Sequence, residues 1–293
     1  MPTGRYSMVA VHGDRTPACA LLALALSLAA LHTARGADVV TNAPPVAAPT
    51  NIPPLGFQVG EELVYRVYWG FIPVAESRIT TEWVQEDGRT LLAIRMRTVS
   101  NRVIEKIYPV DDFIESVVDP ATFLPLRFTK KLSEGRYRAH QITTFAHTNL
   151  TAHWESKIHP SQKDFAIEPD TRDIVSFMYS MRSQRFRPGD DKHYRVMADE
   201  KIYDLWVHAR VDEKVDLPNF GEISSVKIEP EAAFQGFFVR EGKGWLWVSN
   251  DGRRLCTKMV ATIPVANIKV LLWEVNGPGD DFWTRKTKAN AAP

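Results

Sequence analysis

Apolar and polar residues alternate along much of the chain between residues 57 and 275. Within residues 63–69, one face carries Leu63, Tyr65, Val67 and Trp69. Successive side chains of a strand point to opposite faces, so a period of two indicates strands with one buried face. The same alternation occurs in residues 92–98, 124–129 and 205–211. The pattern is typical of an antiparallel sheet.

Short turn sequences separate these runs. Each contains Asp, Asn or Gly, residues that tolerate the positive φ of tight hairpins. The turn sequences are Glu86–Gly88, Ser133–Gly135, Asn219–Gly221 and Asn250–Gly252. We therefore predict a mainly β fold in which the sheet meanders through consecutive hairpins.

One segment has a helical period instead. The spacing predicts a helix over residues 171–184, which Asp170 can cap and which Asp173 supports with negative charge at the helix start. Arg187–Asp190, with its Pro and Gly, ends the segment. The apolar residues that recur at helical spacing are Ile174, Phe177, Met178 and Met181.

The start of the chain predicts export. Residues 18–31 form an apolar run interrupted only by Ser27, with Arg5 and Arg15 before it. A membrane-spanning helix needs about 20 apolar residues, whereas a signal-peptide core has about 7–15. We predict a signal peptide over residues 1–36, cut after Gly36, with translation starting at Met1 or Met8. No second apolar run is long enough to span a membrane, so no transmembrane segment is expected after cleavage.

The remaining chain divides into three parts. Residues 37–56 are rich in Pro and Ala, which is typical of an extended linker. Residues 57–275 carry the alternating pattern and form the expected β-rich domain. Residues 276–293 begin with a structure-breaking Gly-Pro-Gly sequence and continue with polar residues, so we expect a flexible tail.

Charge and cysteine content give no support for a nucleic-acid partner or a reactive thiol. Residues 1–36 hold three of the 36 basic and one of the 35 acidic side chains, so the exported chain has a net charge near −1. This balance gives no electrostatic reason to expect nucleic acid or an anionic membrane as a partner. Cys256 is the single cysteine after residue 36, so it forms no internal disulfide, and its apolar surroundings favour a packed thiol over a reactive one.

The sequence lacks recognisable catalytic and metal-binding motifs. Six histidines follow residue 36, and none has the spacing of a known metal site. The nucleophile elbow, the dinucleotide fingerprint and the phosphate-binding loop are absent. We therefore predict no catalytic residue, no metal ligand and no cofactor.

Aromatic residues give the only candidate binding site. Large amphipathic rings on one face of a sheet can line a pocket for a lipid, glycan or peptide. The alternative interpretation is that these rings fill the core of a large β domain. The candidate ligand-binding residues are Tyr65, Trp69, Trp245 and Trp247.

Three stretches resemble a known family. Residues 59–70 resemble the start of the exported domain of unknown function 3108 family, and residues 72–75 fit a short segment that follows there. Residues 244–255 resemble a later Trp-Ser and Arg-Arg segment, from which Gly252 and Cys256 depart. The helix with Asp173, Ser176, Tyr179 and Arg182 resembles the middle of the family.

The resemblance implies a bacterial exported protein with a curved antiparallel sheet and no assigned activity. It supplies no catalytic residues. The shape it implies is a half-barrel-like meander, similar to that of lipoprotein carriers, with one short helix packed near the middle of the sheet. Shape alone is a weak basis for function.

Three functions remain open. The leading hypothesis is a non-enzymatic periplasmic or cell-surface protein that binds an apolar or amphipathic ligand, or a partner protein. The alternative is a hydrolase of envelope polymers, which a pocket holding His208 or His153 beside a carboxylate would favour. An outer-membrane barrel ranks last, because the expected strands carry charged residues on one face.

Overall fold

The computed structural model describes residues 46–49, 52–198, 200–234, 237–238, 243–263 and 266–291. The predicted signal peptide, residues 1–36, lies outside this part of the chain. Of the predicted linker, only residues 46–49 and 52–56 are described, and they belong to no helix or strand. No helix within the described ranges has the length and apolar character needed to cross a membrane.

Strands dominate the described chain, and helices are short. The helical elements are η1 (Ile104–Lys106), α2 (Ile174–Met181) and α3 (Phe282–Ala291). The strands are β1 (Glu62–Trp69), β2 (Ile72–Glu86), β3 (Arg89–Ser100), β4 (Asp111–Val118), β5 (Pro125–Glu134), β6 (Tyr137–Ala146), β7 (Thr151–Ser156), β8 (Ser161–Ala166), β9 (Arg172–Asp173), β10 (Asp191–Ala198), β11 (Lys201–Leu217), β12 (Gly221–Phe234), β13 (Phe237–Phe238), β14 (Lys243–Ser249), β15 (Cys256–Ile263) and β16 (Ala266–Asn276).

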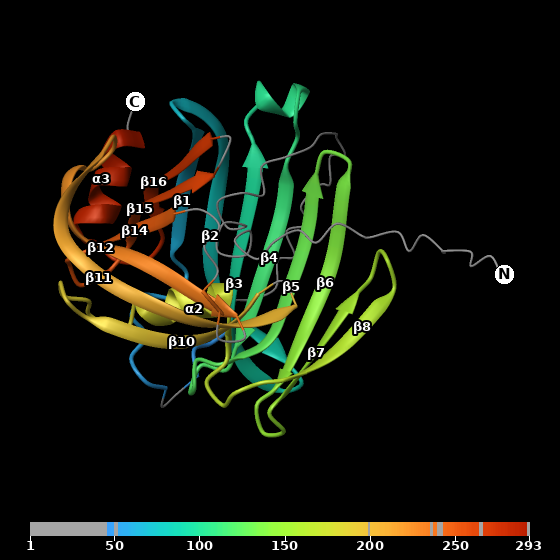
Figure 1. Ribbon diagram of the computed structural model, residues 1–293. Coiled ribbons are helices and arrows are strands. Elements are labelled where there is room, and N and C mark those ends of the chain that lie inside the picture. Colours follow the sequence, from blue (N-terminus) through green and yellow to red (C-terminus); the bar gives the residue numbers. More distant parts are fainter. Residues whose placement is uncertain are drawn as a thin grey trace.

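Within the described residues, all strands belong to one sheet with the order β8-β7-β6-β5-β4-β3-β2-β1-β16-β15-β14-β12-β11-β10-β9, and β13 pairs with β12. Neighbours are antiparallel except β9 and β10, which are parallel. The sheet curls so far that Phe145 of β6 and Ala152 of β7 pack with Met197 of β10. Figure 1 shows the two halves of the sheet facing each other, with α2 between them. This architecture confirms the predicted mainly β fold with a large curved sheet.

Alternation separates an inner from an outer face along most strands. Leu92 and Ile94 of β3 are fully buried inside, whereas Arg95 on the outer face donates to Glu115 of β4 at 2.6 Å. Bulges interrupt this regularity. One bulge lies between Ala209 and Val211 of β11, and it turns Val211 outward, away from the inner face that the sequence pattern predicted for it.

The predicted helix lies inside the curl, packed against β4 and β10. It is shorter than predicted, and its cap is Asp173 rather than Asp170, because Asp173 is the last extended residue before the helix. The Asp173 carboxylate accepts the backbone N–H groups of Val175 and Ser176 at 2.8 and 2.9 Å and the Ser116 hydroxyl at 2.6 Å. Burial raises the pKa of Asp173 in spite of these three bonds.

The end of the chain corrects a second expectation. The predicted flexible tail, residues 276–293, is contradicted over residues 276–291, because α3 occupies most of these and packs against β16 (Figure 1). Trp283 is 1 % exposed and stacks edge-on against Phe220 at 4.9 Å between ring centroids. Asp281 caps the helix start by accepting the N–H groups of Trp283 and Thr284. One buried tryptophan and one capping aspartate thus stabilise a helix that the polar composition of the segment does not predict.

We expect Trp283→Ala to lower the free energy of unfolding by about 3–5 kcal/mol, as is usual for a large aromatic side chain lost from a packed interior. Lys286→Ala, at an exposed position of the same helix, should cost less than about 0.5 kcal/mol. Urea denaturation of both variants measures the difference. Equal, small losses would mean that α3 does not belong to the folded core.

Candidate functional site

The turn between β14 and β15, residues 250–254, is called here the arginine turn. Its conformation depends on Asp251, whose Oδ1 accepts the backbone N–H groups of Arg253 and Arg254, both at 3.1 Å, and the Ser249 hydroxyl at 2.7 Å. The other carboxylate oxygen accepts the indole N–H of Trp283. The turn is therefore tied to α3 through the same side chain that shapes it.

Arg253 belongs to a buried cluster of charges. Glu61, just before β1, is fully buried and accepts both terminal nitrogens of Arg182, the residue after α2, with Nη2 at 3.0 Å from Oε2. Arg253 Nη1 lies 3.3 Å from the same Oε2, and Arg253 Nε donates to Asp281 at 2.7 Å. Two carboxylates and two guanidinium groups thus join four segments that are far apart in the sequence.

The cluster is electrically balanced, which is why it can be buried. Moving a charge out of water costs several kcal/mol unless an opposite charge and hydrogen bonds compensate. Burial by itself lowers the pKa of Arg182, but the Glu61 carboxylate outweighs this effect, and the pKa lies above its ordinary value. Gly56 lets the chain pass directly over Arg182, where a Cβ would lie 2.3 Å from its carbonyl carbon.

A small apolar cavity of about 40 Å³ lies beside this cluster. Its volume corresponds to roughly three water molecules. Met178 and Met181 of α2 form one wall, and Arg182 and Arg254 form the polar rim. The strands contribute Leu63, Tyr65, Ile79, Leu246, Val248 and Cys256.

The thiol and phenol groups in the cavity wall stay neutral. Burial raises the pKa of the Cys256 thiol to about 12, so the thiol is protonated at neutral pH. Burial likewise raises the pKa values of Tyr65 and Tyr179 well above their ordinary values. The cavity therefore holds no thiolate or phenolate nucleophile.

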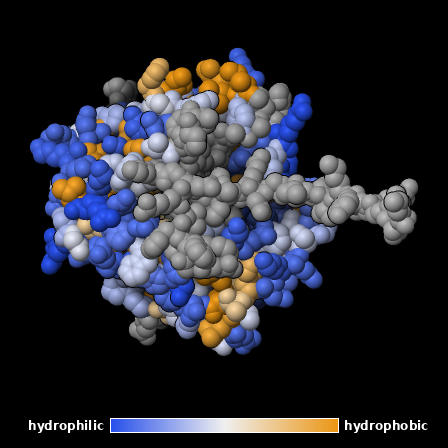
Figure 2. Space-filling model, in the orientation of Figure 1, coloured by the Kyte–Doolittle hydropathy of each residue, from blue (hydrophilic) through white to orange (hydrophobic). Residues whose placement is uncertain are grey.

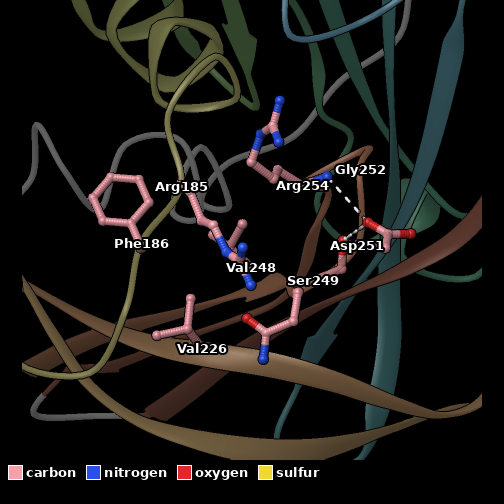
Figure 3. Close-up of a pocket in the computed structure, with 9 residues that line it drawn as sticks. Arg185, Phe186, Val226, Val248, Ser249, Asp251, Gly252 and Arg254 are labelled. Carbon is pink, nitrogen blue, oxygen red and sulfur yellow. Dashed lines mark hydrogen bonds between the residues drawn. The ribbon is translucent and has the colours of Figure 1, made fainter.

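A larger pocket of about 220 Å³ adjoins the cavity and shares Val248 and Arg254 with it. It is called here the polar pocket for its arginine, serine, asparagine and aspartate side chains, although Phe186, Val226 and Val248 also line it. Figure 3 shows Arg185 and Arg254 among the side chains around this pocket, with Asp251 and Ser249 at the base of the turn. Neither Arg185 nor Arg254 forms an ion pair with any described carboxylate. On its other side, the arginine turn borders a hollow of about 430 Å³ next to α3.

The structure does not bring the four predicted aromatic residues together. Tyr65 lines the cavity. Trp245 and Trp247 lie on the opposite face of β14 from Leu246 and Val248, and Trp69 is 55 % exposed at the far end of β1. A ligand could not contact all four at once.

Trp247 is buried although it faces away from the cavity. Its indole N–H donates to Glu213 at 2.7 Å, and Lys258 Nζ lies 4.3 Å from its ring centroid. Lys227 Nζ stands 5.6 Å from the ring centroid of Trp245. Long side chains from neighbouring strands thus cover both rings, as alkyl stems of lysines often do.

Sequence reasoning missed Arg185 and Arg254. A pair of adjacent arginines after a turn gives no indication that one is buried in an ion cluster while its neighbour faces a pocket. The signal that existed was the Asp251-Gly252 turn itself, because an Asp at that point can fix the following backbone.

Histidine–carboxylate pairs exist, but not in these pockets. His153 lies 2.7 Å from Asp164, and His208 lies 2.6 Å from Asp191. Both pairs connect neighbouring strands on the outer face of the sheet, whereas the residues that line the pockets described above include no histidine. Among the described residues, no group of three or more His, Cys, Asp or Glu side chains could hold a metal ion.

Comparison with known proteins gives a family and a fold. A family model described as "Protein of unknown function (DUF3108)" matches residues 64–272. A β-barrel-like protein of domain of unknown function DUF1849 from Brucella abortus aligns over 76 % of this chain and 100 % of its own, with 8 % identity and a TM-score of 0.50. A putative lipoprotein from Parabacteroides distasonis aligns over 76 % and 98 %, with 10 % identity and a TM-score of 0.31. No curated protein matches the chain.

We expect Glu61→Gln to lower the free energy of unfolding by about 3–5 kcal/mol, because it leaves two buried guanidinium groups without their shared carboxylate. Glu62→Gln is the matched control, since Glu62 pairs with Arg78 at the surface and such pairs contribute about 1 kcal/mol or less. Urea denaturation compares the two. Similar losses would contradict a special role for the cluster. Adding Arg182→Met to the Glu61→Gln variant should recover part of the lost free energy of unfolding, and no recovery would contradict that role as well.

We also expect the Cys256 thiol to resist alkylation. With a pKa of about 12, its thiolate fraction at about pH 8 is at least roughly a hundredfold below that of an ordinary cysteine. Iodoacetamide labelling followed by peptide mapping of Cys256 measures the rate. The rate should rise to that of a free thiol in concentrated urea. Fast labelling of the folded protein would contradict the pKa shift.

Proposed function

Since the chain belongs to the family of proteins of unknown function described as DUF3108, which prescribes no activity, we propose a function from the site itself. The protein binds an amphipathic ligand whose acidic group is held by Arg185 and Arg254 and whose apolar part enters the cavity against α2. It does so as an exported protein of the bacterial cell envelope, without catalysing a reaction.

The observation that carries this proposal is the junction of two unlike pockets. An apolar cavity and a polar pocket share Val248 and Arg254, so one ligand could occupy both. Ligand sites are mostly apolar with a few polar groups that fix orientation. A guanidinium group without a carboxylate partner is well suited to an anion, because its N–H donors match carboxylate or phosphate geometry.

The two volumes indicate which part of the ligand each space would hold. The polar pocket, about 220 Å³, accommodates a head group, whereas the cavity, about 40 Å³, accepts only the first part of an apolar chain. Met178 and Met181 line the cavity, and methionine side chains adapt their shape readily. Rearrangement of these two side chains would lengthen the cavity along α2.

Export is supported by the first 36 residues, which combine a short apolar run with a basic flank and small residues before the expected cut. A binding role rather than catalysis is supported by the chemistry of the pocket walls. They offer a protonated thiol and arginines. The Ser249 hydroxyl lies 2.7 Å from the Asp251 carboxylate in the polar pocket, but both groups are engaged with the backbone, since Ser249 accepts the Leu255 N–H and Asp251 accepts the N–H groups of Arg253 and Arg254. The hydrolase alternative finds no histidine beside a carboxylate among the described residues that line these pockets.

Titration calorimetry with dodecanoate, and with dodecanol as its neutral analogue, tests the proposal. Arg254→Gln should weaken dodecanoate binding about tenfold, corresponding to one charge-assisted hydrogen bond. Met178→Trp should abolish binding by filling the cavity. Arg210→Gln, on the outer face where Arg210 pairs with Glu229 at 2.8 Å, is the matched control and should bind normally.

Thermal denaturation of each variant ensures that weak binding is not due to unfolding. Equal affinity of the Arg254 and Arg210 variants would contradict the proposed anion site. Equal affinity of the native protein for dodecanol and dodecanoate would contradict the requirement for an acidic group.

A further inference from the structure

Large apolar side chains are exposed together at one end of the sheet. Phe71, in the turn between β1 and β2, is 88 % exposed, and Val103, before η1, is 70 % exposed. Isolated exposed apolar residues are normal, but a cluster indicates an interaction surface. The cluster, called here the apolar tip, comprises Trp69, Phe71, Ile72, Val103 and Ile107.

Hydrogen bonds join the two connections that carry these residues. The Asn101 backbone N–H donates to the Val74 carbonyl at 2.9 Å, and the Asn101 side chain donates to the Pro73 carbonyl. The apolar tip is therefore one surface. Figure 1 shows both connections at the top of the view, and Figure 2 shows hydrophobic groups gathered along that same edge.

The folded core holds the tip in place. Tyr68 and Ile104, the partly buried neighbours of the exposed residues, pack against the main core. Gly70 has a φ of 61°, which permits the tight turn, and its N–H donates to Asn267 of β16 at 2.9 Å. Phe71 is thus exposed on a well-anchored turn.

Basic side chains flank the tip. Arg102 and Lys106 are exposed within the β3–β4 connection, with Glu105 as the acidic residue between them. The β5–β6 turn lies alongside, since the Gly135 N–H donates to the Pro109 carbonyl at 3.0 Å, and it adds the exposed Arg136. Among the exposed charged side chains of these two connections, three are therefore basic and one is acidic.

We propose that the apolar tip docks the protein on the surface of an anionic phospholipid bilayer. Protruding apolar side chains enter the boundary between head groups and acyl chains, and tryptophan favours that depth. Arg102, Lys106 and Arg136 remain at the level of the anionic head groups, where each basic side chain strengthens binding about fivefold. A projecting tip bordered by positive charge matches this partner, whereas a protein partner would have to supply a matching acidic groove.

The tip and the arginine turn lie at opposite ends of the same strands. β1 runs from Glu62, next to the buried Glu61, to Trp69 at the tip. β15 likewise begins at Cys256, beside the arginine turn. Near its other end Ala261 pairs with Ile268 of β16, and Ile268 in turn pairs with Trp69 at the tip. Bilayer docking therefore goes beyond the proposed ligand binding, and each can be tested without the other.

Cosedimentation with vesicles tests the docking. We expect binding to vesicles of phosphatidylcholine mixed with phosphatidylglycerol, and at least about tenfold weaker binding to phosphatidylcholine alone. The double variant Phe71→Ser, Val103→Ser should lose at least about tenfold in partitioning into the mixed vesicles. Arg102→Gln with Lys106→Gln should lose a similar factor, and high salt should reduce binding of the native protein.

Leu150→Ser is the matched apolar control, because Leu150 is 41 % exposed at the opposite end of β6 from the tip. It and Arg254→Gln should sediment like the native protein. Absence of vesicle binding, or an equal loss in Leu150→Ser, would overturn the proposal. So would sedimentation velocity showing that the native protein dimerises and that the Phe71, Val103 variant does not, since the tip would then contact a second copy.

Discussion

The fold is organised around a buried carboxylate. Glu61 is fully buried and lies in contact with two arginines, Arg182 and Arg253. Each charge would be costly to bury alone, so all three must be present in the same place for any of them to be tolerated. Through Asp281 the constraint extends to α3. The start of β1, the end of α2, the arginine turn and the C-terminal helix are therefore fixed relative to one another by electrostatics and by packing together.

The candidate site is a consequence of that arrangement. Arg253 points into the cluster because Asp251 fixes the turn, and the next residue, Arg254, then reaches the pocket on the other side. The end of α2, held by the Glu61–Arg182 pair, brings Met181 to the wall of the apolar cavity. The buried charge cluster thus positions Arg254, whose Nε donates to the Arg182 carbonyl but which has no described carboxylate partner, beside the apolar cavity.

The sequence predicted the sheet because alternation reports one buried face strand by strand, and Leu92 and Ile94 show how well this works. It also contained the stretches that resemble the family, but not the reason why they occur together. The ion pair between Arg182 and Glu61 spans 121 positions, and no local pattern encodes such a contact. The predicted tail failed for a related reason, because the helix there depends on burial of Trp283 rather than on its own propensity.

The four predicted aromatic residues do not form one site, because alternation predicts which side chains share a face but not which other side chains pack on that face. Trp245 and Trp247 share a face, as expected, but it is the face opposite Leu246 and Val248, where Trp247 is buried in the main hydrophobic core and lysine side chains lie over both rings. The central claim is that an anionic amphiphile binds inside, between α2 and the arginine turn. A crystal structure with ω-bromododecanoate tests it most directly. Anomalous density for bromine beside Met178, with the carboxylate at Arg254, is the predicted result. Density beside Trp245 on the opposite face of β14, or none in the cavity, would contradict it.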